Sequence, residues 1–171
     1  EGGQPEKASQ AWNAMVTVRA GDPSRYLEAA TVFWDYFDYG RAAELLLEAR
    51  AATRDPVLHA NRLAAVYESN GDHEKAVGEY ILVLWQVDLY DLEARRRLSY
   101  LSRARKLKPV ILERFRSLMA RHPDDARLVT ACAEWLVLVG DEREKAALYL
   151  AAVEKHRDMD LLEAIGAFFD G

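Results

Sequence analysis

The chain has 171 residues, of which 50% are hydrophobic and 30% are charged, and its formal net charge is −5. A chain of this length can bury one substantial core, and no apolar run approaches the roughly 18 residues that span a bilayer. The single cysteine, Cys132, excludes an internal disulfide framework and a thiolate zinc cluster, and the acidic balance argues against a dedicated nucleic-acid binder.

The first residues, 1–6, have a glycine-containing polar composition that cannot pack, and they predict a linker or a remnant of cloning. The chain begins with Glu1 rather than methionine, and residues 161–171 read as a helix that stops abruptly. We therefore expect a piece of a longer protein.

Apolar residues recur at helical spacing through almost the whole chain, as at Tyr26, Ala29, Ala30 and Phe33. Strict alternation of apolar and polar residues, which is typical of strands, is not sustained anywhere. The β-leaning run 81–84 lies inside a helical pattern. The sequence predicts an all-α protein of about ten helices, whose short connections make neighbours antiparallel.

Breaks between the predicted helices recur regularly. Asp22-Pro23 and Asp55-Pro56 predict helix starts, with aspartate as the N-cap and proline in the first turn, and 123–125 predicts a third. Glycine followed by aspartate at Gly71 and Gly140 predicts breaks between helices. Pro56 follows Pro23 by 33 residues and Gly140 follows Gly71 by 69, so the spacing indicates a period near 34 with two helices per period.

Each period carries large apolar and small residues at matching places. The equivalent first positions are 26, 60, 95 and 129, and the small residues beside the apolar stripe are Ala30, Ala64, Ser99 and Ala133. The matching residues of the four periods are Tyr26, Ala29, Ala30, Phe33, Ala42 and Leu46; Ala60, Leu63, Ala64, Tyr67, Ala76 and Tyr80; Arg95, Leu98, Ser99, Ser102, Ile111 and Phe115; and Val129, Cys132, Ala133, Leu136, Ala146 and Leu150.

In this pattern the chain resembles the tetratricopeptide repeat (TPR) family. The resemblance implies a right-handed α-α superhelix, a solenoid of stacked antiparallel helix hairpins that forms one domain over 7–171. A related helical repeat is the alternative. The implied divisions are a half repeat at 7–22, repeats at 23–56, 57–90, 91–124 and 125–158, and a terminal helix of a truncated or capping repeat at 159–171. Self-association through the ends of such a solenoid is compatible with this architecture.

Residues with catalytic or metal-binding chemistry do not form a recognisable motif. No two of the four histidines are three or four residues apart, and the sequence lacks a nucleophile elbow and a glycine-rich phosphate loop. Cys132 lies on an apolar stripe, where we expect a small buried hydrophobic residue rather than a reactive thiol. We expect no enzyme activity, no cofactor and no bound metal.

One strongly basic segment stands out between Ala94 and Lys108. It contains seven arginines and lysines and no acid, so the rest of the chain has a net charge of −12 (−5 minus 7). Arg96, Tyr100 and Arg103 fall on one helix face and could hold a carboxylate, a phosphate or an acidic peptide. The alternative is a solvated face that pairs with acids such as Glu68 and Asp88.

The resemblance also implies a concave groove lined by the first helix of each repeat. Its candidate binding residues here are Trp34, Asn61, Arg96, Arg97, Tyr100 and Arg103. Trp34 is equally well explained as packing against a neighbouring hairpin. The other implied groove residues are Leu27, Thr31, Ala65, Glu68, Thr130, Glu134 and Val137.

Some members of the family use a carboxylate clamp to read the acidic tail of a chaperone. The corresponding places here hold Leu27, Thr31, Arg62, Glu93 and Arg97, and only Arg97 fits the clamp. We therefore do not expect a chaperone cofactor of that type.

These observations favour a non-enzymatic scaffold that binds a peptide or partner protein in its groove. One alternative is a regulatory or substrate-recruiting segment of a larger enzyme. Another is an RNA-binding helical array, which the excess acid disfavours because phosphate binding needs several cations along one track.

Overall fold

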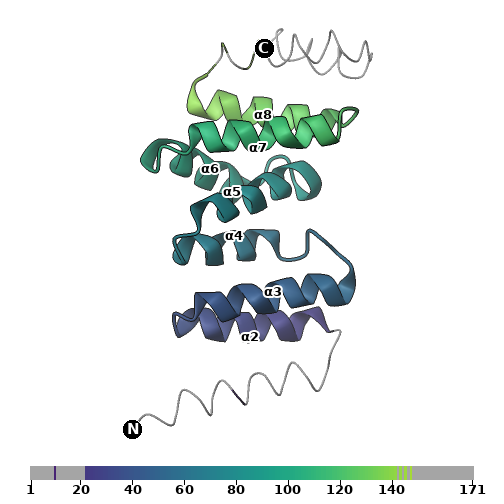
Figure 1. The fold of residues 1–171 in the computed structure, drawn as a ribbon, viewed down its shortest axis with the longest axis vertical. Helices are drawn as coiled ribbons and strands as arrows, with labels where there is room; N and C mark the ends of the chain where they lie inside the picture. The colour runs from purple at the N-terminus through teal and green to yellow at the C-terminus, as the bar shows by residue number, and fades with distance from the viewer. Residues whose placement is uncertain (1–9, 11–21, 142, 144, 146, 148–171) are drawn as a thin grey trace. The chain divides into compact units, whose positions relative to one another are not determined.

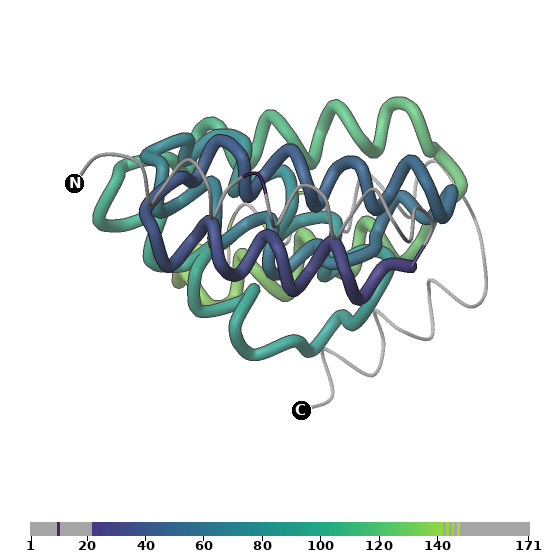
Figure 2. Tube along the Cα trace, turned by 90° about the horizontal axis from the view of Figure 1, so that it is seen from below, coloured from purple at the N-terminus to yellow at the C-terminus, as the bar shows by residue number. Residues whose placement is uncertain are grey.

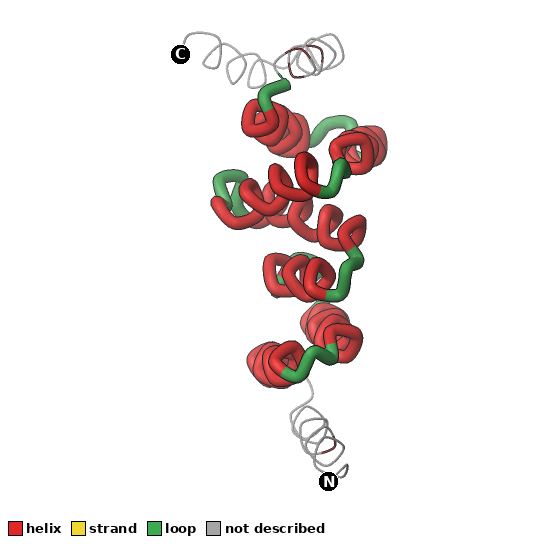
Figure 3. Tube along the Cα trace, turned by 90° about the vertical axis from the view of Figure 1, so that its left-hand side faces the viewer, coloured by secondary structure: helices red, strands yellow, loops and turns green. Residues whose placement is uncertain are grey.

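The structure is a computed structural model that describes residue 10, residues 22–141, and residues 143, 145 and 147. Over these residues it contains seven α-helices, one π-helical turn and no strand, which confirms the all-α prediction (Figures 1 and 3). The predicted linker at 1–6, nearly all of the half repeat at 7–22 and the terminal helix at 159–171 lie outside the described residues. The chain divides into two compact units, residues 1–79 and 80–171.

In the first unit, helices α2 (Pro23–Asp35) and α3 (Tyr39–Thr53) form a hairpin (Figure 1). Asp22 begins α2 as predicted, since its carboxylate accepts a hydrogen bond of 3.0 Å from the Ser24 amide and Pro23 occupies the first turn. The buried core between the two helices consists of Tyr26, Ala29, Ala30, Phe33, Ala42, Ala43, Leu45, Leu46 and Ala49, with Leu63 and Val66 from α4.

Helices α4 (Ala60–Ser69) and α5 (His73–Leu82) follow, and α4 does not begin where the sequence predicts. The Asp55 carboxylate accepts a hydrogen bond of 3.0 Å from the Val57 amide, as a cap would, but it closes only one turn. His59 then adopts a left-handed backbone with φ of 56°, which interrupts the helical path. The predicted start at Asp55-Pro56 is therefore wrong, because the helix restarts at Ala60.

A buried ion pair joins three segments of the first unit. The Arg50 guanidinium on α3 donates to both carboxylate oxygens of Glu79 on α5, at 3.1 and 2.6 Å, and both side chains are largely buried. Its Nε also donates to the Leu58 carbonyl at 2.9 Å, in the turn before α4. This bidentate ion pair and the bond to Leu58 fix the end of α3 against α5 and against the turn before α4.

The second unit contains the π-helical turn η1 (Val83–Val87), α6 (Leu92–Ala104), α7 (Lys108–Arg121) and α8 (Ala126–Val139). Figure 2 follows the chain through these elements by colour. Asp91 and Asp125 cap α6 and α8 through the amides three residues on, so the predicted start at 123–125 is confirmed. Helix α8 packs against both α6 and α7.

Two tryptophans stabilise the second unit. Trp135 of α8 is fully buried, and its ring centroid lies 6.0 Å from that of Phe115 on α7. The Trp85 indole in η1 donates a hydrogen bond of 2.7 Å to the same Asp125 carboxylate that caps α8. Asp125 thereby connects η1 to the start of α8.

Left-handed residues end the helices α2, α4, α6 and α8 at a regular interval. They are Phe37, Gly71, Lys106 and Gly140, with φ between 57° and 82°. Their spacings are 34, 35 and 34 residues, the same steps that separate the predicted equivalent positions 26, 60, 95 and 129. The predicted breaks at Gly71 and Gly140 are confirmed.

Three of these helix ends share one hydrogen-bond pattern. The amide after the left-handed residue donates to the carbonyl five residues back, which is the Schellman arrangement. The bonds are Asp38 to Phe33 at 2.9 Å, Asp72 to Tyr67 at 2.8 Å, and Asp141 to Leu136 at 3.0 Å.

Among the described residues, no helix combines the length and the apolar character that crossing a membrane requires.

Candidate functional site

Helix α6 carries most of the basic segment, and its two faces differ as predicted. Leu98 and Leu101 are fully buried, whereas Arg96, Tyr100 and Arg103 are exposed. Amphipathic spacing explains this division, since residues three and four apart share one side of a helix. The sequence thus placed these three side chains correctly on the outer face.

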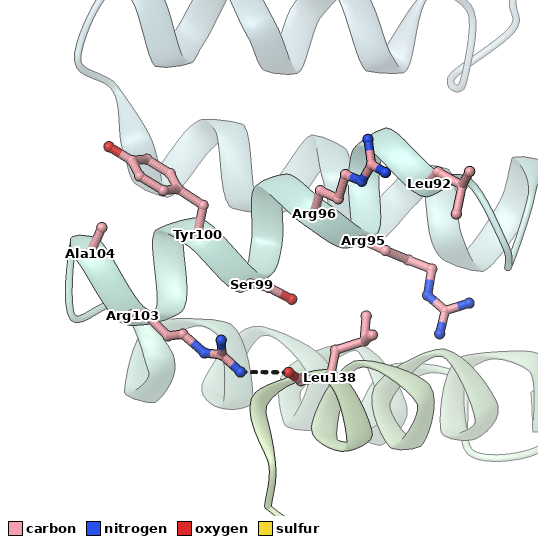
Figure 4. Close-up of a pocket in the computed structure, with 8 residues that line it drawn as sticks. All are labelled: Leu92, Arg95, Arg96, Ser99, Tyr100, Arg103, Ala104 and Leu138. Carbon is pink, nitrogen blue, oxygen red and sulfur yellow. Dashed lines mark hydrogen bonds between the residues drawn. The ribbon is translucent and has the colours of Figure 1, made fainter.

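A pocket of about 680 Å³ lies along this outer face, between α6 and α8 (Figure 4). The pocket is lined by two rows of α6 residues and by one residue of α8. Within each row, successive residues are four positions apart in the sequence. Figure 4 shows the row that contains Arg103 directed toward α8 and the row that contains Arg96 and Tyr100 extending away from it. The lining residues are Leu92, Arg96, Tyr100 and Ala104 in one row, Arg95, Ser99 and Arg103 in the other, and Leu138 on α8.

Arg95 is held in place by a neighbouring acid. Its guanidinium lies 3.2 Å from the Glu134 carboxylate on α8, where the two side chains are 17% and 24% exposed. It also lies over the Tyr90 ring, 5.8 Å from the centroid. This ion pair neutralises Arg95 and fixes its position at the edge of the pocket.

Two polar atoms of the pocket lining are buried. They are Arg95 Nε and Ser99 Oγ, and within the part of the chain that the structure describes neither has a hydrogen-bond partner. A buried donor without a partner is unfavourable by about 1–3 kcal/mol, so such a group favours any ligand that can accept its hydrogen.

Arg103 contacts the end of the neighbouring helix. Its Nη2 donates a hydrogen bond of 2.7 Å to the Leu138 carbonyl, one of the last carbonyls of α8 (Figure 4). A cation is favourable at a helix C-terminus because of the helix dipole. The bond holds the Arg103 side chain, and the partial negative charge of the helix end balances only part of its positive charge, since no carboxylate among the described residues pairs with Arg103.

Lys108, the first residue of α7, pairs with Asp141. Glu134 of α8 and Asp141 just after it thus pair with Arg95 and Lys108 of the basic segment. Within the described part of the chain, no acidic side chain lines the pocket. These ion pairs neutralise Arg95 and Lys108. The charged residues of the basic segment that line the pocket without a carboxylate partner among the described residues are therefore Arg96 and Arg103.

The six predicted site residues do not all line this pocket. Arg96, Tyr100 and Arg103 do, whereas Arg97 lies elsewhere on α6, with its guanidinium 5.1 Å from the Tyr100 ring centroid. Trp34 and Asn61 belong to the first unit. Trp34 is half-buried against the α2–α3 core, and Asn61 is half-buried on α4.

The pocket also contains residues that sequence reasoning did not select as site residues. Arg95 and Ser99 follow from α6 periodicity, because they are eight and four residues before Arg103. Leu138 comes from another helix, but it follows Ala104 by the repeat interval of 34 residues. The predicted repeat thus makes Leu138 the counterpart of Ala104, which also lines the pocket.

Cys132 is buried in α8, as predicted. Across the described residues, no group of three or more histidines, cysteines or acids is arranged to hold a metal ion.

Comparison with known protein families, with curated proteins and with solved structures finds no match.

Proposed function

We propose that the chain is a TPR-like helical-repeat module that binds a protein or peptide along the outer face of α6 and α8. In this proposal it acts as a scaffold rather than as a catalyst. The architecture and the binding role each have support from particular residues.

The recurrence of buried positions supports the repeat architecture. In the first unit, the buried residues Tyr26, Ala29 and Ala30 of α2 correspond to Ala60, Leu63 and Ala64 of α4, 34 residues later. In the second unit, the buried residues Ala94, Leu98 and Leu101 of α6 correspond to Leu128, Cys132 and Trp135 of α8 at the same interval. Tandem copies of one hairpin explain both this recurrence and the left-handed helix ends.

The observation that carries the binding proposal is the pocket between α6 and α8. Arginine and tyrosine are the residue types enriched where interfaces gain most of their energy. Arg96, Tyr100 and Arg103 present both types on one exposed face, beside a hollow large enough for a side chain of a partner. TPR-like modules, by the resemblance drawn above, bind partners with these first helices.

Affinity capture with the intact chain tests the proposal. We expect a protein partner to be retained by the unmodified chain and lost by the double variant Arg96→Glu/Arg103→Glu, because the substitutions reverse two pocket charges. Arg105→Glu is the matched control, since Arg105 is exposed and does not line the pocket.

Circular dichroism of each variant shows whether helix content is preserved. Equal capture by the double variant and the control would place the binding surface elsewhere. Retention of nucleic acid instead of protein, sensitive to nuclease treatment, would favour an RNA-binding array.

A further inference from the structure

We propose that the pocket recognises an extended acidic peptide segment in which two carboxylates flank an apolar side chain. This inference rests on the proposed function and specifies its ligand. It follows from the charge of the pocket, the separation of its cations, its apolar surface and its buried donors.

The charge of the pocket selects an anionic ligand. Arg95 is compensated by Glu134, whereas Arg103 donates only to a neutral carbonyl, and Arg96 is exposed with no ion pair to any described residue. Because no acid among the described residues lines the pocket, its two cations without a carboxylate partner attract negative charge.

The separation of these two cations selects a ligand with more than one anionic group. Arg96 and Arg103 are seven residues apart on α6, an axial distance of about 10 Å at 1.5 Å per residue. Figure 4 shows Arg96 extending away from α8, while Arg103 is held on the Leu138 carbonyl. A single small anion cannot contact both groups in this arrangement. An extended peptide spans this distance in about three residues, at 3.1–3.4 Å per residue.

The pocket lining also offers apolar surface. Tyr100 lies between the two arginines on α6 and is 45% exposed, Leu92 lies one turn before Arg96 and is 67% exposed, and Leu138 contributes from α8. An apolar side chain between two acids would cover this surface. A nucleic acid fits less well, because its affinity depends on several phosphate contacts along a basic track.

The buried donors suit a peptide backbone. Ser99 lies between the two cations along α6, and Arg95 directly precedes Arg96. Ser99 Oγ and Arg95 Nε have no hydrogen-bond partner among the described residues. A backbone carbonyl of the bound segment supplies the acceptor that these groups lack.

Selection from a library of short random peptides, using the intact chain as bait, tests this chemistry. We expect the enriched peptides to carry two acidic residues about three positions apart with an apolar residue between them. The best enriched peptide is then labelled, and its affinity is measured by fluorescence anisotropy. We expect Arg96→Gln and Arg103→Gln each to weaken binding about tenfold or more, through loss of a charged hydrogen bond.

Arg105→Gln, which removes an equal charge outside the pocket, should leave the affinity within about twofold, since it loses only a screened long-range interaction. Ser99→Ala tests the buried hydroxyl, and we expect weaker binding at unchanged helix content. Enrichment of peptides without acidic residues would overturn the inference while leaving the proposed function intact. If no peptide is enriched, the inference fails, and capture of a protein partner still decides the proposed function. If a single-stranded oligouridine binds more tightly than every selected peptide, both fail.

Discussion

Phe37 occupies a backbone conformation that disfavours a bulky side chain. Its φ is 63°, and the left-handed residues that follow α4 and α8 in the same way are Gly71 and Gly140. A left-handed backbone is unfavourable by about 1–3 kcal/mol for residues other than glycine. The side chain is 77% exposed, so burial offsets little of that strain. Its ring contacts the Tyr39 ring edge-on, with 6.2 Å between the two ring centroids.

We therefore expect Phe37→Gly to raise the free energy of unfolding by about 1 kcal/mol, since it relieves the left-handed strain. The reciprocal change, Gly71→Ala, should lower it by about 1 kcal/mol. Nothing lies within 4 Å of a Cβ placed at Gly71, so backbone strain alone produces that loss. Urea unfolding followed by circular dichroism measures both variants. A destabilised Phe37→Gly variant would mean that the contact with Tyr39 outweighs the strain.

At the scale of the elements, helix starts and ends were predictable where a single local signal determines them. Asp22 and Asp125 cap helices because their carboxylates reach amides in the first turn, and Gly71 and Gly140 permit the left-handed turn. The start at Asp55 was predicted wrongly because a left-handed histidine, His59, has no reliable sequence signature. The π-helical turn at 83–87 was likewise not predicted, since its apolar residues also suit an α-helix.

Helix α4 is closely packed at Ala64, so we expect this position not to tolerate a larger residue. Ala64 is fully buried. We expect Ala64→Leu to lower the free energy of unfolding by about 1–3 kcal/mol, because the added carbons overpack a filled site. Ala51→Leu on the exposed side of α3 is the control and should change it by less than about 0.5 kcal/mol. Comparable unfolding midpoints for the two variants would show that the repeat register assigned to α4 is wrong.

At the scale of the whole molecule, the all-α class and one face of the candidate site could be predicted from sequence. Periodicity within α6 was enough to group Arg96, Tyr100 and Arg103. It could not show that Arg95 is compensated by Glu134 or that Arg103 reaches Leu138, because both contacts come from α8. The roles of Trp34 and Asn61 in partner binding remain predictions.

The segregation of charge in the whole chain bears directly on binding. The basic segment contributes +7 in a protein whose other residues sum to −12. The negative charge of the other residues would repel an acidic ligand, whereas the basic segment would attract it, so the ligand is directed toward α6. This effect predicts that specificity depends on the sign of the charges at the pocket.

A charge-swap measurement tests that claim most directly. The affinities of the unmodified chain and of the Arg96→Glu/Arg103→Glu variant are compared for the best acidic peptide and for the same peptide with its acids replaced by lysine. We expect the preference to reverse, with the variant binding the lysine peptide more tightly than the acidic one. An unchanged preference for the acidic peptide in both proteins would contradict it.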